Sequence, residues 1–326
     1  MKVSVAMCTY NGSKYLPEQL ESIRQQSHPI DELIVCDDRS TDSTITLLEQ
    51  FASTTPFPVQ IHINPTNLGS TKNFERALQL CSGEVIFLCD QDDLWRADKV
   101  ARQLEFLKTH PDQEAVFSNA QIIDDDSKPI GRTIWQEIEF DEVAQQRWNN
   151  NHAHEILFGG YVVTGATLAI RKRILASITP FPTVIEELIH DAWIAMILSL
   201  QGKIGFVNEE LISYRKHSSQ QVGFGQKQEK VTLTNRFSRD RQLKLAPLQK
   251  NATDLGALHE LLKNRQDVPA AKLTQLIDRH KHYTVRATLP ASRILRLVPV
   301  FREWINHRYT YSSKDWWLPL LGDLFE

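Results

Sequence analysis

The chain is poor in cysteine and has no long apolar run. Its 326 residues contain four cysteines, none spaced as in a C-x2-C metal or redox motif: Cys8, Cys36, Cys81 and Cys89. We interpret them as buried free thiols of a reducing compartment. Because no run of about 18 apolar residues is present, we do not expect a membrane-spanning helix. The N-terminus lacks the basic and apolar segments of a signal peptide, which predicts a cytoplasmic protein, at most held at the inner face of the membrane.

Two common ligand loops are also absent. The Gly-Ser-Thr-Lys segment at residues 69–72 lacks the spacing of a Walker phosphate loop. A calcium loop that began at Asp90 would need Gly at its sixth position and Glu at its twelfth, where the chain has Trp95 and Ala101. The sequence therefore argues against P-loop and EF-hand chemistry.

An acidic cluster follows an apolar run in the first third of the chain. Residues 84–89, preceded by Gly83, predict an interior strand of a parallel sheet, and Asp90, Asp92 and Asp93 follow it directly. Open α/β sheets bind ligands at this end of their strands. Carboxylates so close together repel one another unless a cation is bound, and oxygen ligands favour Mg²⁺ or Mn²⁺. A solvated acidic turn is the competing interpretation.

The residues before this cluster predict an α/β fold. Apolar runs at 3–8, 32–36 and 59–63 predict strands, and each is followed by a helical pattern. We expect Ser40 or Thr41 to cap the second helix. A β-α-β-α-β-α-β order with polar residues after most strands predicts a mostly parallel sheet flanked by helices, with a ligand crevice.

Charge divides the chain into two regions. Residues 1–227 hold 20 Lys and Arg against 30 Asp and Glu, whereas residues 228–326 hold 17 against 10. A stretch rich in Gly and Gln at 220–228 lies near the change, and only helical patterns follow it. We predict an α/β catalytic domain over 1–222 and a basic, mainly helical region over 223–326.

The basic region carries apolar side chains between arginines. Residues 294–305 are rich in Ile, Leu, Val, Phe and Trp, with arginines at 293, 296, 302 and 308, and residues 316–321 read Trp-Trp-Leu-Pro-Leu-Leu. Basic helices of this kind can lie on an anionic membrane surface. Packing against the catalytic domain is the alternative, and both can hold together.

Taken together, seven motifs resemble the inverting nucleotide-sugar glycosyltransferases of family 2, which have the GT-A fold. The resemblance covers roughly residues 1–220 and rests on the motifs at 3–11, 37–42, 67–69, 90–95, 164–165, 190–191 and 214–217. The Asp-Gln-Asp-Asp-Leu-Trp box with the Tyr-Arg-Lys-His motif is most similar to the bacterial rhamnosyltransferase-like branch that builds O-antigens and capsules.

The resemblance implies a metal site and a general base. In such enzymes the position of Asp92 reaches the metal ion, Mg²⁺ or Mn²⁺, most directly, with Asp90 supporting it; His217 matches a further ligand. Arg215 would pair with phosphate or with an acidic residue. Asp191 would be the general base, although the residue pattern alone equally suggests a helix N-cap before the apolar helix that follows.

The resemblance also implies binding residues. Tyr10 would stack on the base of the nucleotide and Asp38 would accept a hydrogen bond from it. The remaining candidates are Thr9, Lys72 and Asp90 for the nucleotide, and Asp93, Trp95, Thr164, Gly165, His190 and Trp193 for the sugar or acceptor. Two features depart from the pattern: Cys8 precedes Thr9, and the polar, Trp-containing stretch at 137–154 matches no motif.

The implied reaction is metal-dependent transfer, with inversion, of a sugar from a nucleotide diphosphate to a lipid-linked or polysaccharide acceptor. dTDP-rhamnose is the expected donor, and a UDP-sugar with galactosyl or glucosyl transfer is the alternative. A non-catalytic nucleotide-sugar binding subunit is a further possibility. A nucleotidyltransferase would need a glycine-rich, basic turn at residues 9–14, and the Thr-Tyr-Asn-Gly-Ser-Lys sequence there is poor in both glycine and basic residues. The net charge of −3 argues against binding of nucleic acid.

Overall fold

The computed structural model describes residues 1–217, 241–311 and 315–325. They belong to two compact units, Met1–Leu157 with Tyr161–Gly223, and Phe158–Gly160 with Phe224–Glu326. The linker expected at residues 220–228, and with it the boundary at 222/223, lies outside the described residues. The division into domains therefore stays a prediction.

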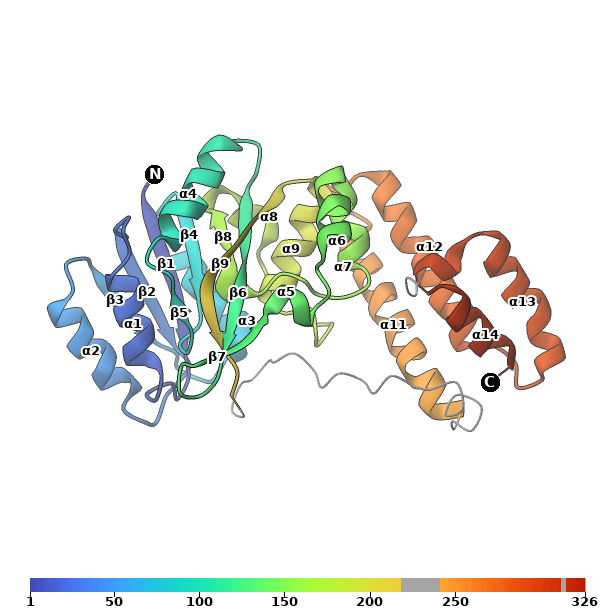
Figure 1. The fold of residues 1–326 in the computed structure, drawn as a ribbon, viewed down its shortest axis with the longest axis horizontal. Coiled ribbons are helices and arrows are strands. Elements are labelled where there is room, and N and C mark those ends of the chain that lie inside the picture. The colour runs from blue at the N-terminus through green and yellow to red at the C-terminus, as the bar shows by residue number, and fades with distance from the viewer. Residues whose placement is uncertain (218–240, 312–314, 326) are drawn as a thin grey trace. The chain divides into compact units, whose positions relative to one another are not determined.

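The first unit contains one sheet, in which nine strands are found among the described residues (Figure 1). Their order is β3-β2-β1-β4-β8-β6-β9-β5, and β7 pairs with β6. The strands are β1 (Val3–Thr9), β2 (Glu32–Asp37), β3 (Val59–Ile63), β4 (Val85–Cys89), β5 (Leu94–Trp95), β6 (Ala115–Ile123), β7 (Pro129–Thr133), β8 (Ala169–Arg171) and β9 (Ile204–Arg215).

Helices flank this sheet. Those longer than eight residues include α3, which packs against β1 and β2, and α4, which packs against β6 and β9. The helices of the first unit are α1 (Leu16–Arg24), α2 (Thr44–Thr54), α3 (Gly69–Leu80), α4 (Lys99–Thr109), α5 (Ile134–Glu137), α6 (Glu142–Arg147), α7 (Ala153–Leu157), α8 (Leu175–Ile178) and α9 (His190–Gln201), with short turns η1 (Trp148–His152), η2 (Gly165–Thr167) and η3 (Lys172–Ile174).

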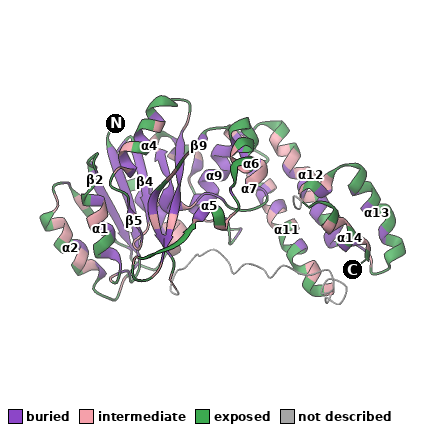
Figure 2. Cartoon of the chain, viewed as in Figure 1, coloured by how far each residue is buried: buried purple, intermediate pink, exposed green. Residues whose placement is uncertain are grey.

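The predicted β-α-β-α-β-α-β order is confirmed, and it places the strand ends that carry polar residues at one edge. Strands β1, β2 and β4 are buried along their whole length (Figure 2), as their continuous apolar runs predict. Parallel pairing aligns Thr9 with Asp37 and Met7 with Cys89. The residues that follow these strands therefore emerge side by side.

Two local predictions were wrong. Neither Ser40 nor Thr41 caps the second helix, because α2 begins at Thr44 with Ser43 at its N-cap position. Instead the Ser40 hydroxyl donates to Asp37, and the Thr41 backbone N–H donates to the Asn11 side chain. The apolar run at 166–170 predicts a further strand, but residues 165–167 form the η2 turn and β8 covers only Ala169–Arg171.

The stretch at 137–154 is packed as short helices and is not an open loop. Its aromatic residues Phe140 and Trp148 join Phe117, Trp135 and Phe206 in one cluster, with ring centroids 4.9 to 5.9 Å apart. The Trp148 indole N–H donates to the carbonyl of Ile204, 2.9 Å away. This segment thereby packs against β6 and β9, a role that its polar composition does not predict.

The second unit is helical throughout its described residues, as predicted. It consists of α11 (Arg241–Leu262), α12 (Ala270–Ala287), α13 (Arg293–Ile305), η4 (Arg308–Tyr311) and α14 (Trp317–Phe325). Across the parts of the chain that are described, no helix is long and apolar enough to cross a membrane. All four cysteines are buried and free, in agreement with their interpretation as structural thiols.

Candidate active site

One side of the site is formed by the turn that follows β1. Thr9 ends this strand, and its hydroxyl donates to the Asp37 carboxylate over 2.7 Å. The backbone of Tyr10 is bonded in both directions to the side-chain amide of Gln91, which belongs to the acidic box. Tyr10 as a whole is 40% exposed, so it is accessible to a ligand. Asn11 next to it has a positive φ of 48°, a left-handed conformation that turns the chain sharply at the site.

Asp37 and Asp38 hold the neighbouring turns in place. Asp38 is buried, and its carboxylate accepts hydrogen bonds from the backbone N–H groups of Leu68 and Gly69 at 2.7 and 2.9 Å and from the Asn64 amide. Gly69 has a φ of 75°, which explains why the Asn-Leu-Gly motif ends in glycine. The predicted contact of Asp38 with a nucleotide base would have to replace or share one of these bonds.

The acidic cluster is positioned by the pairing of β5 with β9. Leu94 lies opposite Ser213, so the residues just before β5 lie beside those that end β9. His217 thereby reaches Asp92, with its Nε2 atom 2.9 Å from the carboxylate. Both side chains are largely buried, and the His217 ring also contacts Tyr15 at 4.8 Å. Two of the three predicted metal ligands thus meet although 125 positions separate them.

Burial and mutual repulsion perturb the other two carboxylates. Burial, with further repulsion from Asp92 and Asp191, raises the pKa of Asp90 to about 8. The pKa of Asp93 is also raised well above its usual value, by burial first and then by Asp92 and Asp90, against the opposing effect of Arg215. The cluster is therefore short of positive charge, as expected of a site that binds a cation.

Arg215 is a structural cation of this cluster. Its side chain is 1% exposed and donates to the carbonyls of Asp92, Asp124 and Asp125 and to the Glu18 carboxylate. Its guanidinium also lies 4.5 Å from the centre of the Tyr15 ring. Of the two roles predicted for it, pairing with an acidic residue is therefore the one that the structure displays.

The predicted base lies at the start of α9. Asp191 is not the N-cap, a position held by Ile189. Its carboxylate instead accepts a hydrogen bond from the backbone N–H of Gly165, 2.7 Å away, and lies near enough to raise the pKa of Asp90. A Cβ atom at Gly165 would come within 2.9 Å of the His190 ring and 3.2 Å of Asp191, so only glycine fits. Thr164, just before Gly165, contributes its carbonyl to the η2 turn.

His190 lies beneath Asp191 in the core. Its ring stacks on Phe74 with centroids 4.0 Å apart, and burial lowers its pKa. Among the described residues, neither of its ring nitrogens has a hydrogen-bond partner. A neutral imidazole therefore lies directly behind the predicted base.

Three predicted binding residues occupy other places. Trp95 is buried, with its ring 5.9 Å from Phe87 and 4.7 Å from the Lys99 ammonium, so it belongs to the core. Trp193 is buried too, and its indole N–H donates to the carbonyl of Ile178. Lys72 lies in α3, and its ammonium binds Glu75 and the carbonyl of Phe181.

Asp93 is also inward-facing. It is 1% exposed, and its Oδ1 atom accepts from the backbone N–H of Arg215 at 2.9 Å. Its Oδ2 atom has no hydrogen-bond partner among the described residues. Asp93 therefore anchors β9 to the acidic box.

Sequence reasoning missed Gln91, Glu18 and Lys99. Gln91 sits inside the acidic box and ties it to Tyr10, a connection that the box motif itself could have suggested. Glu18 pairs with Arg215 and Lys99 is fully buried behind the cluster, where burial lowers its pKa to about 7. Neither residue is part of a motif, so only the fold brings them to the site.

The donor set fits a hard divalent cation in its chemistry. Asp90 and Asp92 offer carboxylate oxygens and His217 an imidazole nitrogen, and a cation would relieve the repulsion that raises the pKa of Asp90. Within residues 1–217, 241–311 and 315–325, however, no three His, Cys, Asp or Glu side chains are already arranged around a metal position. The Asp92–His217 hydrogen bond would have to open for both to bind one ion.

Fold and family can now be assigned. A mostly parallel sheet with an acidic cluster at the ends of its central strands defines the GT-A class of α/β folds. Residues 4–177 match the model of "Glycosyl transferase family 2", which is more than half of the chain. The chain therefore belongs to glycosyl transferase family 2.

Two individual relatives are 28% and 27% identical to this chain over the aligned residues. An uncharacterized glycosyltransferase of Nostoc sp. is 28% identical over 222 residues, which is 67% of this chain and 66% of the relative. The dTDP-rhamnosyl transferase RfbG of Shigella flexneri is 27% identical over 227 residues, 67% of this chain and 73% of RfbG. The match spans 59 to 66% of the length of the first curated relatives.

Solved structures share the fold. TarS of S. aureus, residues 1–349 with UDP-GlcNAc, is similar with a TM-score of 0.55 and 17% identity, covering 95% of this chain and 80% of TarS. The mannosyltransferase PcManGT of Pyrobaculum calidifontis, with GDP-Man and Mn²⁺, gives 0.51 and 16%, covering 99% and 85%. At these identities the likeness concerns the fold alone.

Proposed function

We propose that this chain is a metal-dependent inverting glycosyltransferase that uses a nucleotide-diphosphate sugar. The observation that carries the proposal is the position of Asp191. Its carboxylate is oriented by the Gly165 N–H and lies beside the acidic cluster at the strand ends, where a donor diphosphate would bind. Membership of glycosyl transferase family 2 supports the same reaction class.

In this proposal Asp191 removes the proton of an acceptor hydroxyl. The hydroxyl oxygen then forms a bond to the anomeric carbon of the sugar while the bond to the diphosphate oxygen breaks. Attack from the face opposite the leaving group inverts the anomeric centre, so an α-configured donor gives a β product. A β-linked donor such as dTDP-rhamnose gives an α product.

The acidic cluster and His217, on the other side of the site, would stabilise the leaving diphosphate. Asp90, Asp92 and His217 would hold Mg²⁺ or Mn²⁺, which when bound supplies positive charge to the departing diphosphate. PcManGT, which shares the fold, was solved with Mn²⁺, and this favours a divalent ion without deciding between the two metals. Tyr10, with Thr9 and the turn at Asp38, would contact the base of the nucleotide.

For the donor we propose dTDP-rhamnose, with a lipid-linked saccharide or polysaccharide as acceptor. The similarity to a dTDP-rhamnosyl transferase supports this choice over a UDP-sugar. TarS and PcManGT are named with UDP-GlcNAc and GDP-Man, so the fold itself accommodates different donors. A lipid-linked acceptor would require the enzyme to work at a membrane surface.

The test is a donor panel with the full chain. dTDP-rhamnose, UDP-glucose, UDP-galactose and UDP-GlcNAc are each incubated with Mg²⁺ or Mn²⁺ and a lipid-diphosphate-linked saccharide, and the nucleoside diphosphate released and the product formed are measured. We expect turnover with dTDP-rhamnose and an α-rhamnosyl product by NMR. Turnover with a UDP-sugar alone would replace the donor, and tight nucleotide binding without turnover would favour a binding subunit.

A further inference from the structure

Helix α13 is amphipathic in the reverse of the usual sense. Its buried side chains are Arg296, Val300 and Glu303, two of them charged, at 4%, 2% and 2% exposure. Apart from Val300 and Pro299, its apolar side chains are exposed. Surface helices of globular proteins ordinarily bury the apolar stripe and expose the charged one.

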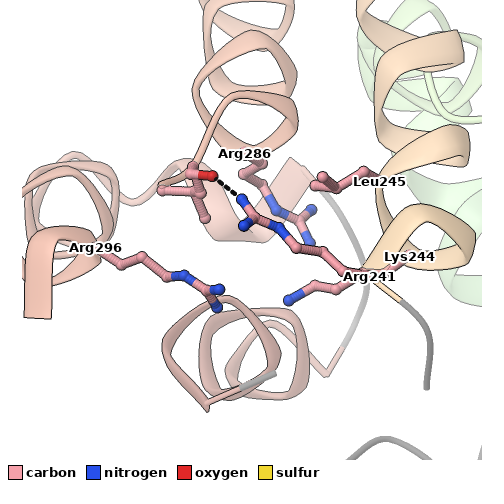
Figure 3. A pocket seen from close by; sticks show the side chains of 6 residues that line it. Arg241, Lys244, Leu245, Arg286 and Arg296 are labelled. Atoms are coloured by element: carbon pink, nitrogen blue, oxygen red, sulfur yellow. Dashed lines mark hydrogen bonds between the residues drawn. The ribbon is translucent and has the colours of Figure 1, made fainter. Parts of the chain in front are cut away.

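A network of buried polar groups fixes this orientation. The Arg296 guanidinium donates to the carbonyls of Pro290 and Ala291, just before α13, and to the carbonyl of Asp323 in α14. Figure 3 shows it beside a small basic pocket that Arg241, Lys244, Leu245, Arg286 and Leu289 also line. Turning the helix over would leave these carbonyl groups without their donor, and a buried polar group without a hydrogen bond is costly.

The other end of α13 is held in the same way. The Glu303 carboxylate is 2.8 Å from Nδ1 of His282 and accepts from the Arg308 guanidinium at 2.9 Å. Arg308 in turn binds Asp278 on α12. Charged groups at both ends of the helix therefore face the interior of the second unit.

The exposed side forms a continuous apolar surface. At about 100° per residue, Ile294, Val298, Phe301 and Ile305 fall on one stripe opposite the buried residues. They are 77%, 78%, 55% and 57% exposed. We define the α13 outer face as this stripe together with the exposed side chains that flank it, Leu295, Leu297 and Trp304. A contiguous surface of this kind marks an interaction site, unlike scattered single side chains.

The charges around the α13 outer face have one sign. Arg293 and Arg302 are exposed beside it. The only carboxylate between residues 291 and 311 is Glu303, and it is buried against His282 and Arg308. Trp316 and Trp317, exposed at the start of α14, add two more residues of the type that prefers membrane–water interfaces.

We propose that the α13 outer face docks on an anionic lipid bilayer. Arginines beside exposed Ile, Leu, Val, Phe and Trp match anionic headgroups above acyl chains; no carboxylate of α13 is exposed, and Asp315 is the exposed carboxylate beside Trp316 and Trp317. At 13 residues the helix is about 20 Å long, shorter than the hydrocarbon core, so it would lie in the plane of the interface. This inference does not depend on the sugar-transfer reaction.

The test is co-sedimentation of the full chain with phosphatidylcholine vesicles, with and without roughly 30% phosphatidylglycerol. We expect binding to the anionic vesicles that weakens at high salt. The triple variant Ile294→Ser/Val298→Ser/Phe301→Ser should lose at least about tenfold in affinity, because it removes the apolar contact. The control Ile63→Ser/Val143→Ser/Val184→Ser replaces three apolar residues of the first unit that are each more than half exposed, and it should bind as the parent does.

A second variant separates charge from apolar contact. Arg293→Gln/Arg302→Gln should bind neutral vesicles as the parent does and lose its preference for anionic ones. The proposal is overturned if the parent binds neither vesicle, or if the triple variant binds anionic vesicles as well as the control does. Light scattering that shows an oligomer, converted to monomer by the triple variant and without vesicle binding, would assign the α13 outer face to a second copy of the chain.

Discussion

The backbone N–H of Gly165 donates a hydrogen bond to the carboxylate of Asp191 over 2.7 Å, across 26 positions of sequence. This bond joins two motifs that each look weak alone, a Thr-Gly turn and a His-Asp pair before a helix. It aims one carboxylate oxygen and leaves the base anchored on the rigid, buried helix α9. The proposed chemistry depends on that orientation.

Asp191→Asn should lower turnover by ~10²–10⁴-fold, since an amide cannot accept the acceptor's proton. The amide keeps the shape of the carboxylate, and its one oxygen can keep one of the two bonds that Asp191 accepts from the backbone N–H groups of Gly165 and Ala192, so nucleotide binding should persist. Initial rates with saturating donor, together with nucleotide affinity from calorimetry, measure both quantities. Glu186→Gln, an exposed carboxylate five positions earlier, is the control. A near-normal rate for Asp191→Asn would remove Asp191 from the mechanism.

Gly165→Ala should impair the rate more than donor binding. The new methyl group would lie 2.9 Å from the His190 ring and 3.2 Å from Asp191, so the base must shift. A misplaced catalytic group typically costs about a hundredfold in rate. Gly160→Ala, where a Cβ meets nothing within 4 Å, is the matched control for the loss of a glycine. Equal rates for the two variants would show that the close packing at Gly165 does not hold the base.

Lys99 should make stability depend on pH. Burial lowers its pKa from 10.5 to about 7, so between these values the unfolded chain binds more protons than the folded one. The stability contributed by this site therefore rises with pH in that window, and the cost of the charge is fully present below about pH 7. Relative to the parent, Lys99→Met should gain most at pH 7 and below, and the difference should shrink by up to ~1.4 kcal/mol per pH unit above it. Denaturant unfolding of both proteins from neutral to alkaline pH measures this, and parallel curves would contradict it.

Arg215→Met should destabilise the first unit by about 2–4 kcal/mol, because three partly buried carbonyl groups and the Glu18 carboxylate lose their donor. The residue joins Asp92 to the 124–127 turn and to Glu18, so nucleotide binding should weaken as well. Arg132→Met is the comparison, since Arg132 forms an exposed pair with Glu137 and its loss should cost less than about 1 kcal/mol. Equal destabilisation of the two variants would mean that the Arg215 network is not a structural element of the site.

The order of strands and helices could be predicted because interior parallel strands are continuous apolar runs. The family resemblance, and not this pattern, predicted Asp92 and His217 as ligands of one metal site, and their side chains lie 2.9 Å apart. The tryptophans could not be placed in this way. Trp95 adjoins the acidic box in sequence, yet its ring is turned to Phe87 and Lys99 in the core, a choice made by tertiary packing.

A near neighbour explains one of the other differences, and long-range partners explain the second. Asp42, and not Ser40 or Thr41, supplies the carboxylate that accepts from the Thr44 N–H at the start of α2. In α13 the arginine and glutamate that look like a solvated face are buried, because their partners Asp323 and His282 come from other helices. No window of neighbouring residues contains these partners.

The central claim is best tested by thermal stability of the full chain with UDP, dTDP, GDP and CDP, each with and without Mn²⁺. A nucleotide present at about 100 times its dissociation constant should add ~2.7 kcal/mol to the free energy of unfolding, which raises the melting temperature by several degrees. We predict stabilisation by dTDP that requires Mn²⁺ and is lost in Asp92→Ala. If no nucleotide stabilises the chain with or without metal, the proposed donor site is contradicted.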